Sequence, residues 1–269
     1  MLTATRDPIA EMAPPVPHID FLNLRFALVS SAEVLNLIVT QSGAPYRYVV
    51  TPNAYDVVSV NEAPERLQPI YRKAWLSVCD SRIVRALARL EGRTLPLVTG
   101  SDLVAALLDT LNSGTEETAA KRLLIVGPTQ QTALTLCARY PRLNFEVLPA
   151  PAGLSHNADA RLAVARACLN RQWDIALFCV GFPAQALIAQ QLDELGCQSG
   201  VALCVGAAID FLTGAQTRAP AWIQRLGLEW AYRLVSQPGR LWRRYLVESP
   251  RIAWIFIRAQ FARRRSNAA

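Results

Sequence analysis

The stretch LLIVGPTQQT at residues 123–132 decides the fold, because it is a continuous apolar run that ends in Val-Gly and leads into helical sequence. IALFCVGFPAQ at 175–185 repeats this pattern, and VALCVGAAID at 201–210 repeats the apolar run and its Val-Gly ending. A strand that is apolar on both faces is buried on both faces, as in a parallel sheet covered by helices. The sequence therefore predicts an α/β fold with a Rossmann-like parallel sheet flanked by helices.

Glycine follows each of these three strands, as Gly127, Gly181 and Gly206. The carboxyl ends of parallel strands lie at one edge of the sheet, and open α/β sheets bind their ligands at that edge. A single glycine marks only a turn, whereas three on one edge favour a cleft large enough for a nucleotide. The G-x-G-x-x-G fingerprint is absent, and no acidic residue lies at the right distance to hold a ribose, which argues against a dehydrogenase.

The sequence before this repeated pattern also alternates between helix and strand signals. SSAEVLNLIVTQS, from about residue 31, has a serine before an apolar stripe and an acid in its first turn, as a helix start does. YRYVVTPN is expected to form a strand, AWLSV a short apolar run that reaches Cys79 and Asp80, and SRIVRALARLEG a helix. Another helix is expected near 64–73. The predicted regions are an extended arm at 1–24, an α/β core at 25–213, and an Arg-rich helical appendage at 214–269.

Composition limits the class of protein. With 269 residues, 52% of them hydrophobic, the chain can bury a sizeable core. No signal peptide and no run of about 18 apolar residues is recognisable, so we expect a cytoplasmic protein. The six cysteines form no C-x-x-C pair, and a buried, reduced thiol is expected for each. With two histidines and no H-E-x-x-H or Asp-x-Asp signature, no metal site is expected.

The excess positive charge is confined to the last fifth of the chain. From Gly214 onward there are eleven arginines, no lysine and two glutamates, a surplus of nine positive charges. Because the whole chain carries +7, the first 213 residues carry a net charge of −2. Arginine grips phosphate and carboxylate groups in a bidentate manner that lysine cannot match. A GC-rich genome would also favour arginine codons, and the whole chain is poor in lysine.

The last residues suggest a helix at a membrane surface. Arg251, Arg258 and Arg265 recur every seven residues and so lie near one side of a helix, beside an apolar side that includes Trp254 and Phe261. Arginine interleaved with aromatic residues is the composition of a helix in a membrane interface, and anionic lipid would attract it. The alternative is a helix packed on its own domain with a solvated basic face.

Polar residues follow two of the early predicted strands. Asp80 lies where AWLSV ends, and a carboxylate at such a strand end would act as a general base if burial raises its pKa. It would alternatively be the N-cap of the next helix. Thr51 and Asn53 follow YRYVV and would either orient a sugar hydroxyl or close a turn.

AIDFLTGAQTRAP places Asp210, a glycine turn and Arg218 within nine residues at the ligand edge. These two charged residues would bind the sugar and the phosphates of a nucleotide. An ion pair between Asp210 and Arg218 is the competing explanation.

At these residues the chain resembles the WecG/TagA/CpsF family of bacterial glycosyltransferases. The family carries a Thr-x-Asn element, an Asp-Gly element, a Gly-x-Pro-x-Gln-Glu element and a long C-terminal block. Here these read Thr51-Pro52-Asn53, Asp80-Ser81, Gly181-Phe182-Pro183-Ala184-Gln185, and Asp210 through Tyr245. The resemblance covers roughly residues 25–250, and its C-terminal block is long and specific.

The resemblance implies a metal-independent, inverting transfer of a sugar from a UDP-sugar to a prenyl-diphosphate-linked acceptor at the inner face of the cytoplasmic membrane, in surface polysaccharide biosynthesis. No cofactor is expected. Asp80 looks like the base that takes the proton of the acceptor hydroxyl, with Thr51 and Asn53 as further catalytic candidates. The expected substrate-binding residues are Gly127, Gly181, Pro183, Gln185, Gly206, Asp210, Arg218, Glu229, Arg233 and Arg240. The expected membrane or acceptor residues are Arg243, Arg244, Arg251, Trp254 and Arg258.

Three departures from the family pattern bear on the donor. Ser81 replaces the usual glycine, Ala186 replaces the glutamate after Gln185, and APAGLSHN (150–157) matches its family counterpart poorly. We favour a hexose or hexuronic acid donor on this basis, with N-acetylmannosamine or its uronic acid as the alternative. The same departures leave open a catalytically degenerate assembly partner.

A nucleic-acid-binding protein is a further alternative for the Arg-rich segment. No nucleic-acid-binding module is legible, and the apolar cluster IAWIFI suits lipid better. A monomer and a homo-oligomer fit the sequence equally well.

Overall fold

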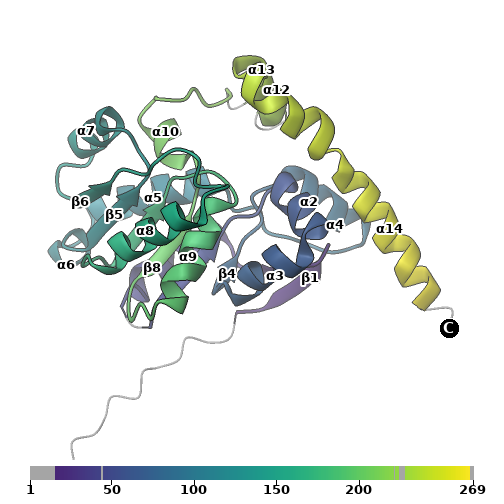
Figure 1. Ribbon diagram of the computed structural model, residues 1–269, viewed down its shortest axis with the longest axis horizontal. Helices are drawn as coiled ribbons and strands as arrows, with labels where there is room; N and C mark the ends of the chain where they lie inside the picture. Colours follow the sequence, from purple (N-terminus) through teal and green to yellow (C-terminus); the bar gives the residue numbers. More distant parts are fainter. Residues whose placement is uncertain (1–15, 44, 221, 224–227, 267–269) are drawn as a thin grey trace, which may run out of the picture.

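A six-stranded parallel sheet forms the centre of the computed structural model, which describes residues 16–43, 45–220, 222–223 and 228–266 (Figure 1). The strand order is β4-β3-β8-β7-β5-β6, and all five neighbouring pairs run parallel. The strands are β3 (Arg47–Val50), β4 (Leu76–Ser77), β5 (Arg122–Val126), β6 (Asn144–Leu148), β7 (Ile175–Phe178) and β8 (Val201–Cys204). The predicted α/β fold with a Rossmann-like parallel sheet is confirmed.

Apart from Arg122 at the start of β5, strands β5, β7 and β8 are apolar because each of their faces packs into a separate core. In β5, Leu123 and Ile125 belong to one buried cluster, whereas Leu124 and Val126 belong to the other. Strands β7 and β8 alternate in the same way, and their residues are almost fully buried. Successive side chains of a strand point to opposite faces, so a continuous apolar run is what a sheet covered on both sides requires.

Helices cover both faces of the sheet. The first core is shared with residues of α2 (Ala54–Glu62), α3 (Pro64–Lys73), α4 (Arg82–Leu90), α8 (Ala158–Leu169) and α9 (Ala184–Glu194). The second core is shared with residues of α1 (Ser31–Thr40), α5 (Gly100–Ser113), α6 (Glu116–Ala119), α7 (Gln130–Arg139) and α10 (Ala208–Leu212). The helices predicted from about residue 31, near 64–73 and over SRIVRALARLEG are therefore confirmed as α1, α3 and α4.

The predicted N-terminal arm is wrong where the structure describes it. Strands β1 (His18–Phe21) and β2 (Leu24–Ala27) pair antiparallel, and Leu22 and Asn23 make the turn with positive φ angles of 49° and 63°. Phe21 and Leu24 are buried against the first core, and this burial holds the hairpin in place. Residues 1–15 of the predicted arm lie outside the described residues.

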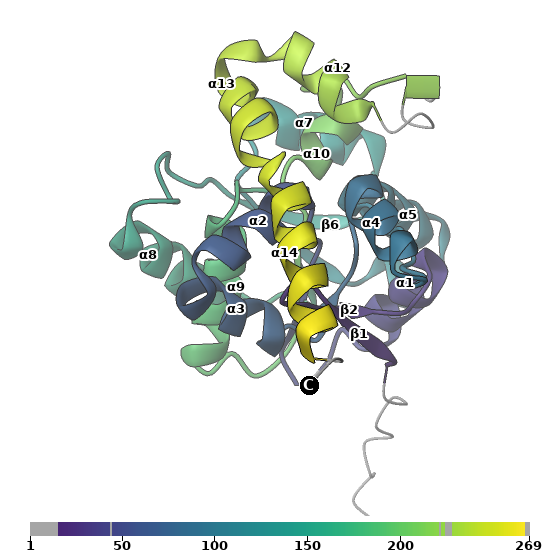
Figure 2. The ribbon, with the colours of Figure 1, turned by 90° about the vertical axis from the view of Figure 1, so that its right-hand side faces the viewer.

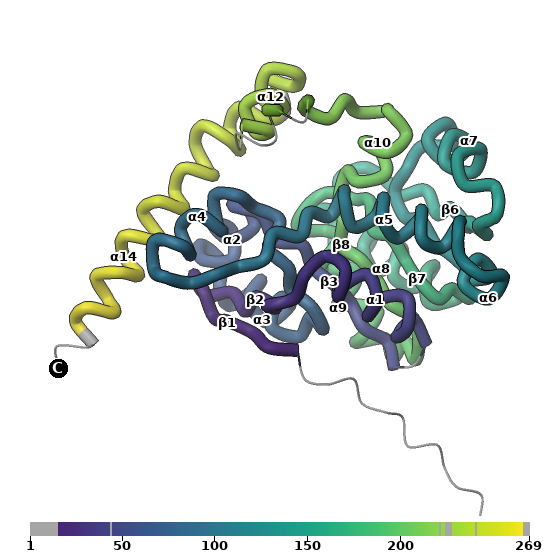
Figure 3. Tube along the Cα trace, turned by 180° about the vertical axis from the view of Figure 1, so that it is seen from behind, coloured from purple at the N-terminus to yellow at the C-terminus, as the bar shows by residue number. Residues whose placement is uncertain are grey.

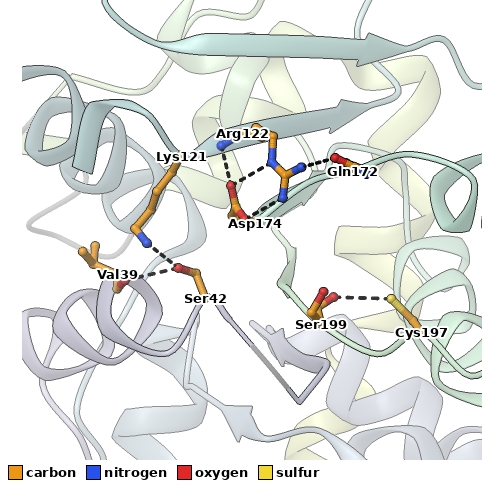
Figure 4. A network of polar contacts seen from close by, with 8 residues as sticks. All are labelled: Val39, Ser42, Lys121, Arg122, Gln172, Asp174, Cys197 and Ser199. Carbon is orange, nitrogen blue, oxygen red and sulfur yellow. Dashed lines mark hydrogen bonds and ion pairs between the residues drawn. The ribbon is translucent and has the colours of Figure 1, made fainter. Parts of the chain in front are cut away.

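Charged and polar groups at the amino ends of the strands are paired with one another (Figure 4). The Asp174 carboxylate, just before β7, accepts hydrogen bonds from the backbone N–H, Nε and Nη2 of Arg122, the first residue of β5, at 2.7, 3.2 and 3.0 Å. Lys121 Nζ donates to Ser42 Oγ at 2.7 Å. These bonds join segments near the amino ends of different strands. The charged groups at this end of the sheet therefore have their partners within the protein.

The C-terminal segment crosses the molecule as a chain of helices and ends in a long one. Its described elements are α12 (Glu229–Ser236), α13 (Pro238–Trp242), a π-helical stretch η1 (Arg243–Glu248) and α14 (Arg251–Ser266). Figure 2 shows α14 lying diagonally over the face that α2, α3 and α4 form. Ile252 of α14 is buried in the first core, with Ile255 and Phe256 packed against it.

Ion pairs hold both ends of α14 to the body of the protein. Arg251 pairs with Glu62 of α2 at 2.6 Å, and Arg263 pairs with Glu91, which caps the end of α4. Helix α14 of the predicted appendage is therefore packed on the core. Within the described residues, no helix combines the length and the hydropathy needed to cross a membrane.

The prediction of a buried thiol for every cysteine is wrong for Cys137. This residue lies exposed on α7, whereas Cys79, Cys168 and Cys204 are buried and Cys179 and Cys197 are half-buried. Helix α7 buries Thr132, Ala133 and Leu136, and Cys137 lies on the other side of the helix.

Candidate active site

A cleft of about 470 Å³ opens beyond the carboxyl ends of β3 and β4, beneath the C-terminal segment. This is the edge at which open α/β sheets bind ligands. The core contributes loops and helix starts, and the C-terminal segment contributes the opposite wall. The lining residues are Asn53, Ala54, Tyr55, Asp80, Ser81, Arg82, Ile83, Leu97, Thr99, Ser101, Phe211, Arg218, Glu229, Trp230, Arg233, Arg244, Tyr245, Ser249, Pro250, Ile252 and Ala253.

Asp80 lies in this cleft and is not a helix cap. The N-cap of α4 is Ser81, whose Oγ accepts a hydrogen bond from the N–H of Val84 at 3.2 Å. The N–H of Asp80 donates to the carbonyl of Pro52 at 3.1 Å, and its Oδ2 accepts from the N–H of Gly100 at 3.3 Å. Because Gly100 is the first residue of α5, the Asp80 carboxylate faces the N-terminus of that helix. The capping alternative for Asp80 is therefore wrong, and its carboxylate is available to a ligand.

Burial raises the pKa of Asp80 to about 8. The hydrogen bond from Gly100 and the charge of Arg233 oppose this shift in pKa, whereas the nearby carboxylates of Glu229 and Asp56 contribute to it. A carboxylate with a pKa in this range holds a proton more tightly than an exposed one, which is the property of a general base that works near neutral pH.

Asn53 links the end of β3 to the C-terminal segment. It is the N-cap of α2, and its Oδ1 accepts from the N–H of Tyr55 at 2.9 Å and from Nη2 of Arg244 at 3.3 Å. The Arg244 guanidinium also lies 4.5 Å from the centre of the Tyr55 ring. Asn53 therefore closes the turn, which was one of the two interpretations from the sequence. It also positions Arg244 in the cleft.

Thr51 does not line the cleft. It is buried, and its hydroxyl donates to the carbonyl of Cys204 at 2.9 Å, so it ties the end of β3 to the end of β8. Of the two interpretations of Thr51, the geometry favours the structural one.

Arg218 lines the cleft but does not pair with Asp210. It forms an ion pair of 2.6 Å with Asp102 in the first turn of α5. Asp210 instead accepts a hydrogen bond from Nε2 of Gln216 at 2.7 Å. The alternative of an Asp210–Arg218 ion pair is therefore wrong, because the loop after α10 carries Arg218 across to α5.

Two further arginines enter the cleft without a carboxylate partner. Within the part of the chain that the structure describes, neither Arg233 nor Arg244 forms an ion pair. Arg233 lies over the ring of Phe211 at 5.1 Å. The Nε atoms of Arg218 and Arg244 are buried without a hydrogen-bond partner among the described residues. Buried donors without a partner suit a site that an anionic ligand fills.

Glu229 is the cleft's second carboxylate from the predicted set. It begins α12, and its charge acts on Asp80. Arg240, which was also expected to bind substrate, belongs to α13, and its side chain lies outside what the structure describes.

The predicted substrate residues that follow β5, β7 and β8 do not line the cleft. Gly127 has a φ of +111°, and a Cβ there would lie 2.8 Å from Val180, so glycine is required by the turn. Gln185 Oε1 accepts from the N–H of Gly206 at 2.8 Å, which joins two neighbouring loops. Gly127, Gly181, Pro183, Gln185, Gly206 and Asp210 thus share the correct edge of the sheet but lie away from this cleft.

The predicted membrane residues divide into three groups. Arg244 lines the cleft, as described above. Arg243 pairs with Glu248 and Arg251 with Glu62, both near the surface. Trp254 and Arg258 are exposed on α14.

Asp56 and Asp102 shape the site and were missed by the sequence analysis. Asp56 is buried behind Asn53, and its Oδ2 accepts from the N–H of Asn53 at 2.9 Å. Burial raises the pKa of Asp56 to about 6, and the charge of Arg244 opposes this shift. Both acids stand three residues after a capping residue, Asn53 or Thr99, and this spacing is a recognisable signal of a helix start.

Two of the departures from the family pattern can be located. Ser81 lines the cleft as the N-cap of α4, whereas Ala186 is buried in α9 and does not line the cleft. Among the described residues, no three His, Cys, Asp or Glu side chains are grouped to hold a metal ion.

The chain matches the family described as "Glycosyl transferase WecG/TagA/CpsF family" over residues 19–266. Two relatives, from Bacillus subtilis (strain 168) and Bacillus spizizenii (strain W23), are both named N-acetylglucosaminyldiphosphoundecaprenol N-acetyl-beta-D-mannosaminyltransferase. The first is 28% identical over 59% of this chain and 57% of its own length, so the match spans little more than half of that relative. The second is 25% identical over 86% of each chain.

Proposed function

The chain belongs to the WecG/TagA/CpsF family of glycosyltransferases, and we propose that it transfers N-acetylmannosamine from a UDP-sugar to a GlcNAc unit carried on a polyprenyl diphosphate. The observation that carries this proposal is the cleft, in which the half-buried Asp80 carboxylate faces a wall that includes Arg218, Arg233 and Arg244. A base for an acceptor hydroxyl and cations for a leaving diphosphate are the two requirements of such a transfer.

The names of the relatives favour the N-acetylmannosamine alternative over the hexose or hexuronic acid donor preferred from the sequence. The departure at Ala186 gave that preference part of its weight, and this residue lies in the core of the protein. Because Ala186 does not line the cleft, its departure from the family pattern is no reason to expect a different donor sugar.

Asp80 acts as the general base in this proposal. Its carboxylate takes the proton of the acceptor hydroxyl, and the oxygen forms a bond to the anomeric carbon of the donor sugar. The bond from that carbon to the UDP oxygen breaks in the same step, and UDP leaves with the electron pair. This single displacement inverts the anomeric configuration and needs one carboxylate only.

The negative charge that develops on UDP is stabilised by the arginines of the cleft. Arg233 and Arg244 form no ion pair within the described residues, so each can bind a diphosphate without first leaving a carboxylate. Arg218 would exchange Asp102 for a phosphate oxygen. In a buried site such fixed donors contribute more than they would in water. Within this proposal the transfer needs no metal ion.

We further propose that the protein works at a membrane surface, because its acceptor would be anchored there by the prenyl chain. Trp254, Ile257 and Phe261 form an exposed apolar stripe on α14. Arg258 is exposed on the same helix. This is the composition of a helix that lies in a lipid interface.

A donor panel tests the proposed function. The purified protein is incubated with GlcNAc on a short-chain prenyl diphosphate and one of UDP-N-acetylmannosamine, its uronic acid, UDP-glucose or UDP-glucuronic acid. Mass spectrometry of the acceptor should show the addition of one N-acetylmannosamine. Turnover with the hexose or the hexuronic acid alone would overturn the assigned donor, and no turnover with any of the four would overturn the proposed transfer.

A further inference from the structure

Helix α4 has one face in the core and an outer face that is both apolar and basic. Val84 and Ala88 are fully buried. Ile83 is 39% exposed and Leu90 is 76% exposed, and the two lie seven residues apart on one side of the helix. The sequence RIVRALARL of this helix contains three arginines and no acidic residue. The exposed side chains of Ile83 and Leu90 do not contribute to the core, so the fold does not explain their apolar character.

Helix α4 lies near α14 at two places. Ile83, at the start of α4, lines the same cleft as Ala253, at the start of α14. At the other end, the Glu91 carboxylate accepts hydrogen bonds from Gln260 and Arg263. The shared cleft at one end and the bonds to Glu91 at the other indicate that the two helices run in the same direction, and Figures 2 and 3 show them near each other in two views at right angles.

The exposed sides of the two helices combine apolar side chains with arginines, and we refer to them together as the α4–α14 surface. On α14, Trp254 and Phe261 are each 61% exposed, and Ile257 is 43% exposed. Exposed arginines border this surface on both helices: Arg82, Arg89, Arg258, Arg264 and Arg265. The acid between the two helices, Glu91, is only 6% exposed and is already bonded to Arg93 and Arg263. An exposed apolar patch of this kind marks an interaction site, and its uncompensated positive charge selects an anionic partner.

From this geometry we propose that α4 is a second membrane contact, which docks with α14 on a surface of anionic lipid. The inference rests on the proposed membrane location and extends it to a helix of the α/β core. Because α4 begins at Ser81 and Arg82, which line the cleft, docking along α4 directs the mouth of the cleft toward the lipid. A prenyl-diphosphate acceptor would then reach Asp80 without leaving the bilayer.

Vesicle flotation tests the role of α4. The double variant Arg89→Gln/Leu90→Gln removes one exposed arginine and one exposed leucine, neither of which lines the cleft. The matched control is Leu134→Gln/Arg166→Gln. It removes the same residue types from exposed positions on α7 and α8, which Figure 1 shows on the opposite side of the molecule from α14. Thermal melts of both variants check that they fold.

The expected result is that the α4 variant partitions onto phosphatidylglycerol vesicles about tenfold more weakly than the wild type, whereas the control partitions normally. Unchanged flotation of the folded α4 variant would overturn the proposal. An equal loss in variant and control would also overturn it, because a general loss of charge would then explain the effect. Binding to neutral phosphatidylcholine as strong as to phosphatidylglycerol would contradict the selection of anionic lipid.

Two further measurements separate this proposal from its competitors. Light scattering of the wild type and the α4 variant tests whether the outer face of α4 binds a second copy of the chain. If the wild type is an oligomer and the α4 variant a monomer, the lipid assignment would be overturned. Turnover with a water-soluble GlcNAc diphosphate should be the same in the wild type and the α4 variant. Loss of flotation in a protein that has no transferase activity would overturn the proposed function while supporting the lipid contact.

Discussion

The charged side chains at the two ends of the parallel sheet differ in whether they have partners within the protein. At the amino ends, Asp174 accepts three hydrogen bonds from Arg122. Burial alone would raise the pKa of Asp174, but these bonds lower it below its usual value. At the carboxyl ends, burial raises the pKa of Asp80 to about 8, and Arg244 has no carboxylate partner in the described residues.

This difference separates charges that hold the fold together from charges that are available to a ligand. A paired charge at the amino ends has its partner within the protein and gains nothing from a ligand. An arginine without an ion-pair partner is costly in the empty cleft and becomes favourable when an anion binds. The carboxyl ends therefore carry the proposed chemistry, and each prediction below tests this division.

Asp80→Asn should cause the largest loss. It removes the proposed base but keeps the size of the side chain, so kcat should fall by roughly 10²–10⁴-fold. The affinity for UDP, measured by calorimetry, should stay within about threefold, because the arginines remain. A variant that turns over at a rate near that of the wild type would show that another group takes the proton.

The pH dependence of kcat/KM should report the raised pKa of Asp80. The base works only when deprotonated, so kcat/KM should rise with pH, about tenfold for each unit well below the pKa, and level off above about 8. The measurement uses the free enzyme at low substrate concentration over pH 5.5–9.5, in buffers of constant ionic strength. A profile that is already flat from about pH 5 upward would contradict a buried carboxylate base.

Arg244→Ala should lower kcat/KM by roughly 10–100-fold, because it removes an unpaired cation from the cleft. The neighbouring Arg243 is a matched control, since it lies outside the cleft and pairs with Glu248 at the surface. Arg243→Ala should leave kcat/KM for a water-soluble acceptor within about twofold of the wild type. Equal losses in both variants would mean that the position of the cation does not matter.

Asp174→Asn, at the amino ends of the strands, should change stability and leave catalysis intact. It weakens the bonds to Arg122 at a partly exposed site, so the free energy of unfolding should fall by about 1–2 kcal/mol. Denaturant unfolding measures this loss, and kcat at a temperature well below the transition should be unchanged. A large loss of kcat in the folded variant would contradict a purely structural role for the charges at the amino ends of the strands.

The sheet was predictable because buried parallel strands leave a strong local signal. Apart from Arg122 at the start of β5, the residues of β5, β7 and β8 are apolar, and these runs were recognised as strands. Strand β6 was not recognised, since its edge position leaves Asn144 and Glu146 exposed and the run NFEVL mixes polar with apolar residues.

The site was predictable only in part, because it depends on contacts between distant segments. Asp80 was identified from its strand end, but its neighbour Gly100 lies 20 residues later and Arg218 finds its partner Asp102 across 116 residues. The Val-Gly turns marked the correct edge but not the cleft, since a turn glycine such as Gly127 is required by backbone geometry alone. Arg244 was assigned to the membrane or the acceptor, together with Arg243, because no local pattern shows that η1 turns Arg244 into the cleft.

The configuration of the transferred sugar tests the central claim most directly, namely that Asp80 acts as the only carboxylate in a single displacement. The one-bond carbon–hydrogen coupling at the anomeric carbon, measured by NMR, gives the configuration of the product and of the UDP-sugar donor. The account predicts that the product is inverted relative to the donor. A product with retained configuration would require a covalent intermediate or attack from the same face, and it would contradict the role proposed for Asp80.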